Sequence, residues 1–429
     1  MRPRTEDNKP PIGASLSLFI LFLINVLNFY DRQVLGALTE PLRHEFGLSD
    51  GQVGALATTF TLVYALAGAP LGRLADKWSR KRLLAAGTAV WAALTALGGF
   101  ATSYLMLLTS RLGVGVGEAV CGPATTSWTG DLAPPERRAR ALARLMMAVP
   151  VGGMLSLAIT GPLAQAYGWR TAIVAAALPA VVFIPALLML REPRRAQAPG
   201  DGPHAAGAYR ALFANAAFRW IVISGAVVNF ALYSFSTFVP AFLTRFHGLS
   251  VAQAGVWSGI GSGVSGILGA WIGGHFGDRV KGHRGRGRMT LAAAAALAAS
   301  PLAFVAVGLP AGSVMAAVLL IMAAYGLLQT YYGLVYAAVQ DVVAPGLRGT
   351  AMGAYFTAMY LCGASFGPLL TGRLSDTFAR AAAGAGPVTE VARAVGLRDA
   401  MFLIPALSAV LALILWAGGR AAAAVPPQE

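Results

Sequence analysis

Long apolar stretches separated by short polar segments run through the whole chain. Each stretch is close to the roughly 20 mostly apolar residues that an α-helix needs to cross a lipid bilayer. The pattern therefore predicts an all-α membrane protein with twelve transmembrane helices. The expected spans are residues 15–38, 51–72, 83–101, 104–127, 139–164, 170–190, 217–243, 251–274, 289–308, 313–338, 347–371 and 399–418.

Composition supports this interpretation. The 429 residues are 56% hydrophobic and only 12% charged, with a mean hydropathy of +0.63, whereas a soluble domain has about 25% charged residues. The first stretch contains charges and is longer than the apolar core of a signal peptide, so we expect it to be retained as a span. These features exclude an ordinary soluble enzyme.

The basic residues are distributed unevenly between the two sides of the expected membrane. Of the 33 Lys and Arg, 24 fall on the side of the two termini and 7 on the other. Short loops rich in Lys and Arg stay in the cytoplasm, so we expect both termini to be cytoplasmic and the membrane to be a bacterial inner membrane. The net charge of +15 is explained by this topology, and no nucleic-acid partner is expected. Residues 376–397 predict a short interfacial helix on the outer side.

The spans form two halves that repeat each other. A segment rich in Pro, Gly and charge separates the sixth and seventh spans, and it predicts an N-terminal bundle over residues 1–193, a cytoplasmic linker over 194–216 and a C-terminal bundle over 217–429. Asp76 after the second span recurs 202 residues later as Asp278, and Asp131 recurs 210 residues later as Asp341. Two motifs with similar offsets indicate a duplicated six-helix unit.

Four charged residues lie inside spans of the first half, namely Asp31 and Arg32 in span one and Arg111 and Glu118 in span four. A charge at the bilayer centre costs at least about 2.5–3.5 kcal/mol, and such residues usually mark a cavity, a partner or an ion path. We expect Asp31 and Glu118 to carry protons, and Arg32 and Arg111 to bind an anion or relay the coupling. The alternative is a permanent structural ion network.

The matching spans of the second half are amphipathic but uncharged. Asn229 and Tyr233 lie in span seven, and Tyr332 and Tyr336 are spaced by four residues in span ten, which places them on one helix face. These side chains are expected to hold the apolar or hydroxylated part of a substrate. Helix–helix packing by tyrosines is the open alternative.

The loop after span two carries the pattern G-x-x-x-D-[RK]-x-x-[RK]-[RK], from Gly72 and Asp76 to Arg80 and the two basic residues that follow. Together with Arg111-x-x-x-Gly-x-Gly in span four, this pattern resembles the major facilitator superfamily over the whole chain. Ser79 stands where the family has a second glycine. The resemblance implies two pseudo-symmetric six-helix bundles and a cytoplasmic latch formed by Gly72, Asp76, Arg80, Arg138 and Asp278. A topology determinant with a tight turn is the alternative.

A narrower resemblance is to the spinster branch of that superfamily. It rests on Asn28-Phe-Tyr-Asp-Arg32 in span one and on Arg111-Leu-Gly-Val-Gly-Val-Gly-Glu-Ala119 in span four. Animal members of this branch move lysolipids and sphingoid phosphates, which implies a proton-coupled transporter of an amphiphilic lipid that works by alternating access. A proton-linked carrier of small organic anions or drugs, and a non-transporting membrane sensor, remain alternatives.

The sequence carries no motif for a nucleotide, a metal or a catalytic nucleophile. The two cysteines are isolated and have no metal-ligand spacing. We therefore expect no enzymatic activity and no cofactor. The expected partners are an amphiphilic or lipid substrate, protons and the membrane, and the resemblance implies a monomer.

Overall fold

The computed structural model describes residues 12–193, 205–280 and 285–423, and these residues form helices and no strand. The helices are α1 (Ile12–Ala37), α2 (Thr39–Phe46), α3 (Asp50–Lys77), α4 (Arg80–Gly99), α5 (Tyr104–Glu118), α6 (Cys121–Leu132), α7 (Pro135–Met146), α8 (Ala148–Ala177), α9 (Pro179–Met189), α10 (Ala205–Ala214), α11 (Ala216–Arg245), α12 (Val251–Arg279), α13 (Arg286–Gly308), α14 (Val314–Val342), η2 (Pro345–Leu347), α15 (Arg348–Ala358), η3 (Met359–Ala364), α16 (Gly367–Ala383), α17 (Glu390–Met401) and α18 (Leu403–Ala423).

The prediction of twelve spans is confirmed. Nine helical stretches of the described residues are long and apolar enough to cross a membrane, and one of them, Arg140–Met189, contains two spans. It reverses direction at Gly168, whose φ of 83° lies in the left-handed region that glycine adopts most readily. Helix α12 and the broken helix α15–η3–α16 complete the twelve.

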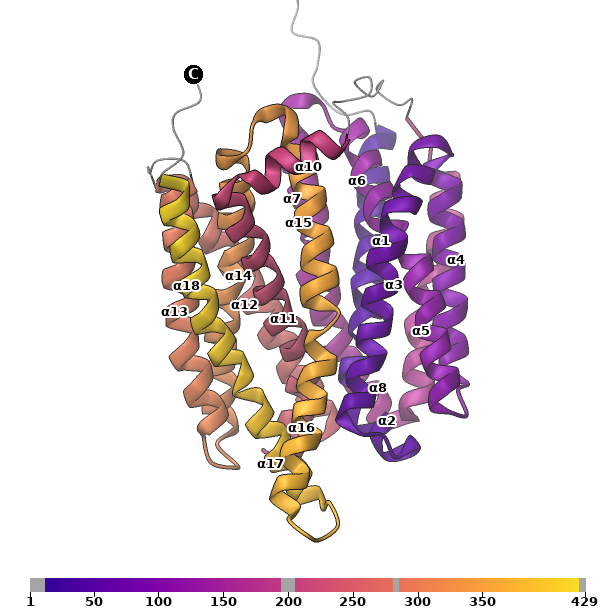
Figure 1. Ribbon diagram of the computed structural model, residues 1–429. Coiled ribbons are helices and arrows are strands. Elements are labelled where there is room, and N and C mark those ends of the chain that lie inside the picture. The colour runs from indigo at the N-terminus through magenta and orange to yellow at the C-terminus, as the bar shows by residue number, and fades with distance from the viewer. Residues whose placement is uncertain (1–11, 194–204, 281–284, 424–429) are drawn as a thin grey trace, which may run out of the picture.

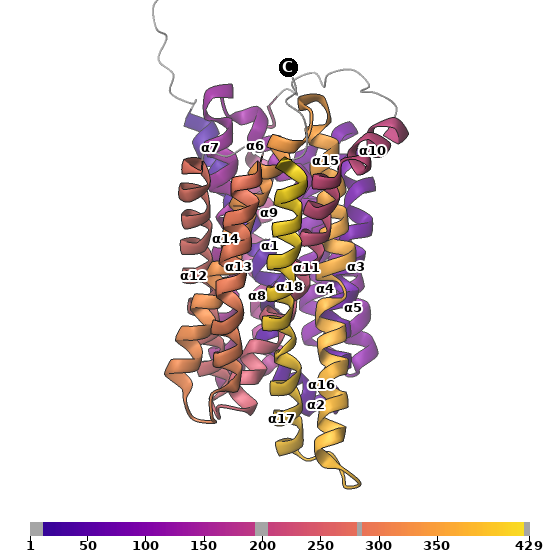
Figure 2. The ribbon, with the colours of Figure 1, turned by 60° about the vertical axis from the view of Figure 1, so that its left-hand side comes forward.

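The two halves of the chain stand side by side, with the N-terminal half in indigo to magenta and the C-terminal half in pink to yellow (Figure 1). The described chain ends, Ile12 and Ala423, lie at the same end of the molecule, which we call the proximal end. The opposite end, which carries α2 and α17, is the distal end. Of the expected linker, residues 194–204 lie outside the described residues, and Ala205–Ala214 form α10, which lies across the proximal end (Figure 2).

The two halves pack along two seams. One seam joins α8 to α12 and the other joins α3 to α16. Glycines bring the backbones together, because a Cβ at Gly259 of α12 would lie 2.7 Å from Met154 O of α8, and a Cβ at Gly54 of α3 would lie 2.2 Å from Pro368 O of α16. Small residues permit this close approach of membrane helices.

The expected interfacial helix over residues 376–397 is wrong. Residues up to Ala383 continue α16, and α17 begins at Glu390, so the two helices form a hairpin that protrudes at the distal end (Figure 1). Thr389 starts α17 by accepting a hydrogen bond from Ala392 N. The Ala-rich sequence is amphipathic, and its apolar face packs between the two helices of the hairpin. A helix that lies on a membrane surface has the same amphipathic pattern, so the sequence fits both structures.

Candidate substrate and coupling site

The four charged residues of the first half form two buried ion pairs. Arg32 Nε lies 3.0 Å from Glu118 Oε2, and Arg111 Nη1 lies 3.7 Å from Asp31 Oδ2. Glu118 is fully buried, and Asp31 and Arg111 are each only 2% exposed. The predicted residues therefore come together, with each arginine facing a carboxylate from the other helix.

Glu118 lies at the end of α5, and close packing of α5 against its neighbours positions it. It is the last residue of α5, and a short turn separates it from α6, which begins at Cys121. The preceding glycines permit close packing, since a Cβ at Gly115 would lie 2.8 Å from Phe60 O of α3 and one at Gly117 would lie 2.9 Å from Trp91 N of α4.

The two ion pairs have different surroundings. The guanidinium carbon of Arg32 lies 4.0 Å from the centre of the Tyr64 ring and 4.6 Å from that of Phe29, and its Nη2 donates to Asn28 Oδ1 over 3.0 Å. This cation–π geometry stabilises the guanidinium without a second carboxylate.

Within the described part of the chain, both ion pairs leave polar atoms without hydrogen-bond partners. Asp31 Oδ2 accepts a hydrogen bond from Thr95 Oγ1 over 2.9 Å. Among the described residues, Asp31 Oδ1, Glu118 Oε1 and the Nε and Nη2 atoms of Arg111 have no hydrogen-bond partner. Buried polar groups without partners are costly and frequently mark a functional site.

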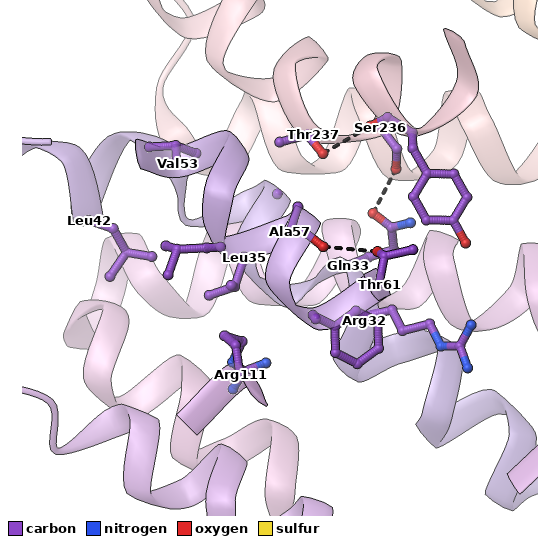
Figure 3. A pocket seen from close by; sticks show the side chains of 14 residues that line it. Arg32, Gln33, Leu35, Leu42, Val53, Ala57, Thr61, Arg111, Ser236 and Thr237 are labelled. Carbon is purple, nitrogen blue, oxygen red and sulfur yellow. Dashed lines mark hydrogen bonds between the residues drawn. The ribbon is translucent and has the colours of Figure 1, made fainter. Parts of the chain in front are cut away.

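A narrow pocket lies between the two halves next to these pairs. Arg32 and Arg111 line it from the N-terminal half, and Ser236 lines it from α11 (Figure 3). Tyr233 of α11 also lines it. Gln33 also lines it and accepts a hydrogen bond from Ser236 Oγ over 2.6 Å. The rest of the wall is mainly apolar, so the pocket combines arginine groups with an apolar surface.

The remaining residues predicted in the second half form a neighbouring polar cluster. Tyr332 donates a hydrogen bond to Asn229 Oδ1 over 2.9 Å, and the rings of Tyr332 and Tyr336 lie 5.6 Å apart. Tyr233 alone of the four predicted residues lines the pocket between the halves. Tyr360, in the π-helical turn η3, connects the halves, because its ring lies 5.5 Å from Tyr64 and 6.4 Å from Tyr233.

The predicted latch residues lie at the proximal end. Arg80 is 1% exposed and pairs with Asp131 over 2.6 Å and with Glu192 over 3.2 Å. Arg138 is exposed and donates to Gly130 O, and Asp278 is exposed. Among the described residues, a Cβ at Gly72 would contact only Pro123 of the same half, at 3.7 Å. The side chain of Asp76 lies outside the described part of the chain.

Several residues of the site were not predicted from the sequence. Thr95 and Tyr64 contact the ion pairs, and Gln33 and Tyr360 connect the two halves. Gln33 follows Arg32 directly and is a polar residue inside a span, so its position in the sequence could have identified it as a candidate site residue. Tyr64 and Thr95 are common membrane-helix residues, and their contacts depend on how helices pack.

Two six-helix bundles around a pocket lined by buried charges define an integral-membrane transporter. The family model of the Major Facilitator Superfamily matches residues 21–368. An MFS-type efflux pump of Mycolicibacterium smegmatis is 32% identical over 418 residues, which are 96% of this chain and 94% of that protein. The chain therefore belongs to the major facilitator superfamily and is not an enzyme.

Within the superfamily the chain resembles spinster proteins. Protein spinster homolog 1 of Bos taurus is 28% identical over 391 residues, covering 86% of this chain and 74% of that protein. The crystal structure of a bacterial homologue of the human lysosomal transporter spinster, in an inward-facing and unoccupied conformation, matches with a TM-score of 0.84 and 26% identity, over 96% of this chain and 98% of that one. The spinster resemblance inferred from spans one and four is thus confirmed.

Proposed function

We propose that this protein is a proton-coupled secondary transporter that moves an amphiphilic lipid, such as a lysophospholipid or sphingoid phosphate, by alternating access. The observation that carries the proposal is the pair of buried Arg–carboxylate contacts beside a pocket that is otherwise largely apolar.

The ion pairs support proton coupling. A carboxylate at Glu118 holds Arg32, whereas a protonated Glu118 releases it, and Asp31 has the same relation to Arg111. A released guanidinium is a bidentate partner for a phosphate or carboxylate. Proton binding and anion binding are therefore linked through the same arginine, which is the requirement for coupled transport.

The pocket supports an amphiphilic substrate. Arg32 and Arg111 both line it, and Leu35, Leu42, Val53 and Leu56 contribute apolar surface to its wall. We expect a charged head group to bind beside the arginines and an aliphatic chain to lie along the leucines once the halves separate further. We expect Asn229, Tyr332 and Tyr336 to contact the substrate once the halves rearrange.

The arrangement of the halves supports an inward-facing state. In the part of the chain that the structure describes, the ion pairs joining the halves are Arg43–Glu390, Arg245–Glu40 and Arg245–Asp50, and all lie at the distal end.

Charge distribution supports a bacterial inner membrane with the proximal end cytoplasmic. We expect the motif of Gly72, Asp76, Arg80, Arg138 and Asp278 to latch the cytoplasmic end when the distal end opens, and the protein to work as a monomer.

The substitution Glu118→Gln tests the coupling, because glutamine keeps the shape of the side chain but cannot release a proton. In proteoliposomes with an imposed pH gradient, we expect gradient-driven transport of a labelled lysophospholipid to fall by about a hundredfold, while exchange of substrate across equal pH persists. The matched control is Asp399→Asn, which removes a carboxylate paired with its own neighbour, Arg398. Full gradient-driven transport by Glu118→Gln contradicts the proposal.

The second candidate is an efflux pump for small amphiphilic compounds. The 32% identity to an MFS-type efflux pump over nearly the whole chain favours it. In the same proteoliposomes, competition by unlabelled lysophospholipids without competition by hydrophobic drugs supports the lipid, and the reverse result supports efflux.

A further inference from the structure

The distal ends of two helices, one in each half, receive hydrogen bonds from the opposite half. Helix α3 begins at Asp50, and the Asp376 carboxylate of α16 accepts from both Asp50 N and Gly51 N over 2.9 Å. Helix α12 begins at Val251, and the Gln165 side chain of α8 accepts from Ala252 N over 2.9 Å. The first N–H groups of a helix have no partner within the helix, so each half completes a helix start of the other.

The two arrangements are copies of each other. Both helix starts have the sequence S-x-x-Q-x-G, at Ser49–Gly54 and Ser250–Gly255, and both form a capping box. Both bonding helices carry G-x-x-x-[DQ], at Gly372–Asp376 and Gly161–Gln165. The two helix starts are 201 residues apart and the two acceptors 211 residues apart, which matches the duplication of the halves.

The glycines of these motifs have equivalent contacts. A Cβ at Gly372 would lie 2.1 Å from Asp50 O, and a Cβ at Gly161 would lie 2.8 Å from Val251 O. Both carbonyls belong to the first residue of the helix in the opposite half. Each seam therefore ends in one backbone-to-backbone contact and one side chain that bonds the helix start.

The copies differ in charge. Asp376 is a carboxylate at the positive end of the α3 dipole, where an anion is favoured, and Gln165 is neutral. The charged seam also holds Asp50, which accepts from Arg245 over 2.7 Å and from Ser375 Oγ over 2.6 Å. Charge-assisted hydrogen bonds are about twice as strong as neutral ones.

We propose that these two cross-bonded helix starts form the distal gate of the transport cycle, and that the charge of Asp376 sets how firmly the gate closes. This inference rests on the proposed alternation between two access states. The gate holds the distal end closed in the present conformation, and both cross-bonds break when that end opens.

The test measures the separation of the halves directly. Spin labels on Thr102→Cys and Ala382→Cys, two exposed positions at the distal end, report the distance across the gate in detergent or nanodiscs. Cys362 is replaced by Ala, and Cys121 is fully buried and stays. We expect Asp376→Asn to raise the ratio of separated to closed molecules about tenfold, equivalent to about 1.4 kcal/mol.

The controls follow from the duplication. Asp399→Asn removes a distal carboxylate that pairs within its own half, so it leaves the distance unchanged. Gln165→Glu moves a carboxylate to the neutral seam, so adding it to Asp376→Asn restores the closed distance. If Asp376→Asn does not yield folded protein, Gly372→Ala provides the test, because its methyl group separates the same seam and opens the gate.

The gate proposal is wrong if the label distance is unchanged in folded Asp376→Asn or Gly372→Ala. It is also wrong if Asp399→Asn raises the proportion of separated molecules as much as Asp376→Asn does. A parent protein that alternates between two label distances but shows no proton-driven transport contradicts the proposed function and leaves the gate intact.

Discussion

Thr95 is the residue that determines how Asp31 is held. Its hydroxyl donates to Asp31 Oδ2, the same oxygen that faces Arg111, and Thr95 is 1% exposed. Arg111 is 3.7 Å away, so the shorter threonine contact is the better-formed hydrogen bond of the two. The orientation of the carboxylate therefore depends on a side chain of α4 as well as on its arginine.

The substitution Thr95→Val keeps the shape of this side chain and removes the hydrogen bond. We expect the free energy of unfolding to fall by about 1–3 kcal/mol, because a buried acceptor loses its partner. Thermal unfolding in detergent measures this change. Thr88→Val is the matched control in the same helix, since Thr88 is also buried but bonds only to Leu84 O of its own helix. Equal losses in both variants contradict the role given to Thr95.

Glu192 provides a prediction of pH dependence at the proximal end. Burial raises its pKa, but hydrogen bonds from Ser79 and Arg80 outweigh burial, and the pKa of Glu192 is lowered from its ordinary value of 4.5. A carboxyl group whose pKa is lowered on folding stabilises the protein above its ordinary pKa, and this stabilisation is lost as pH falls through the lowered value.

We therefore expect Glu192→Gln to lower stability at pH 7 by about 1.5–3 kcal/mol, the contribution of a hydrogen bond to a charged group. The difference from the parent should narrow below pH 4.5. Melting temperatures of both proteins across the range from about pH 3.5 to about pH 7.5 test this expectation. Asp278→Asn, at an exposed position, is the control, and a constant difference at all pH values contradicts the argument.

At the scale of elements, the α8–α12 seam depends on glycines. A Cβ at Gly259 would lie 2.7 Å from both Met154 O and Ala158 N, and backbone atoms cannot rotate away as a side chain can. We expect Gly259→Ala to destabilise the protein by about 1–3 kcal/mol through overpacking. In the same helix, a Cβ at Gly274 would meet no atom of the described residues within 4 Å, so Gly274→Ala should be neutral. The unfolding midpoints of the two variants test this difference. An unchanged midpoint in Gly259→Ala would contradict the claim that the α8–α12 seam depends on this glycine.

The span pattern and the repeat were predictable because membrane thickness sets helix length and duplication leaves matching motifs. The charged residues of the site were predictable because a charge in a span is rare. The pairing of Arg32 with Glu118, and of Arg111 with Asp31, could not be predicted, since it depends on where α5 ends and how α1 rotates against it. The α16–α17 hairpin was missed because its composition equally fits a surface helix.

At the scale of the whole molecule, the proposed orientation can be tested with single cysteines in the Cys362→Ala background. Ala382 is exposed at the distal end, and Gly346 is exposed in η2 at the proximal end. We expect a membrane-impermeant maleimide to label Ala382→Cys in spheroplasts nearly completely, and to label Gly346→Cys only after the membrane is permeabilised. The opposite labelling would place the termini outside.

The pairing of the four buried charges also determines how the transporter responds to voltage. Arg32 with Glu118 and Arg111 with Asp31 are each electrically neutral. A membrane potential does work of about 2.3 kcal/mol at 100 mV on each elementary charge that crosses it, and a neutral pair that moves as a unit carries no net charge. In the proposed proton-coupled cycle, reorientation with both pairs intact therefore moves no net charge, and we expect the current during turnover to report mainly the protons and the substrate charge that are carried.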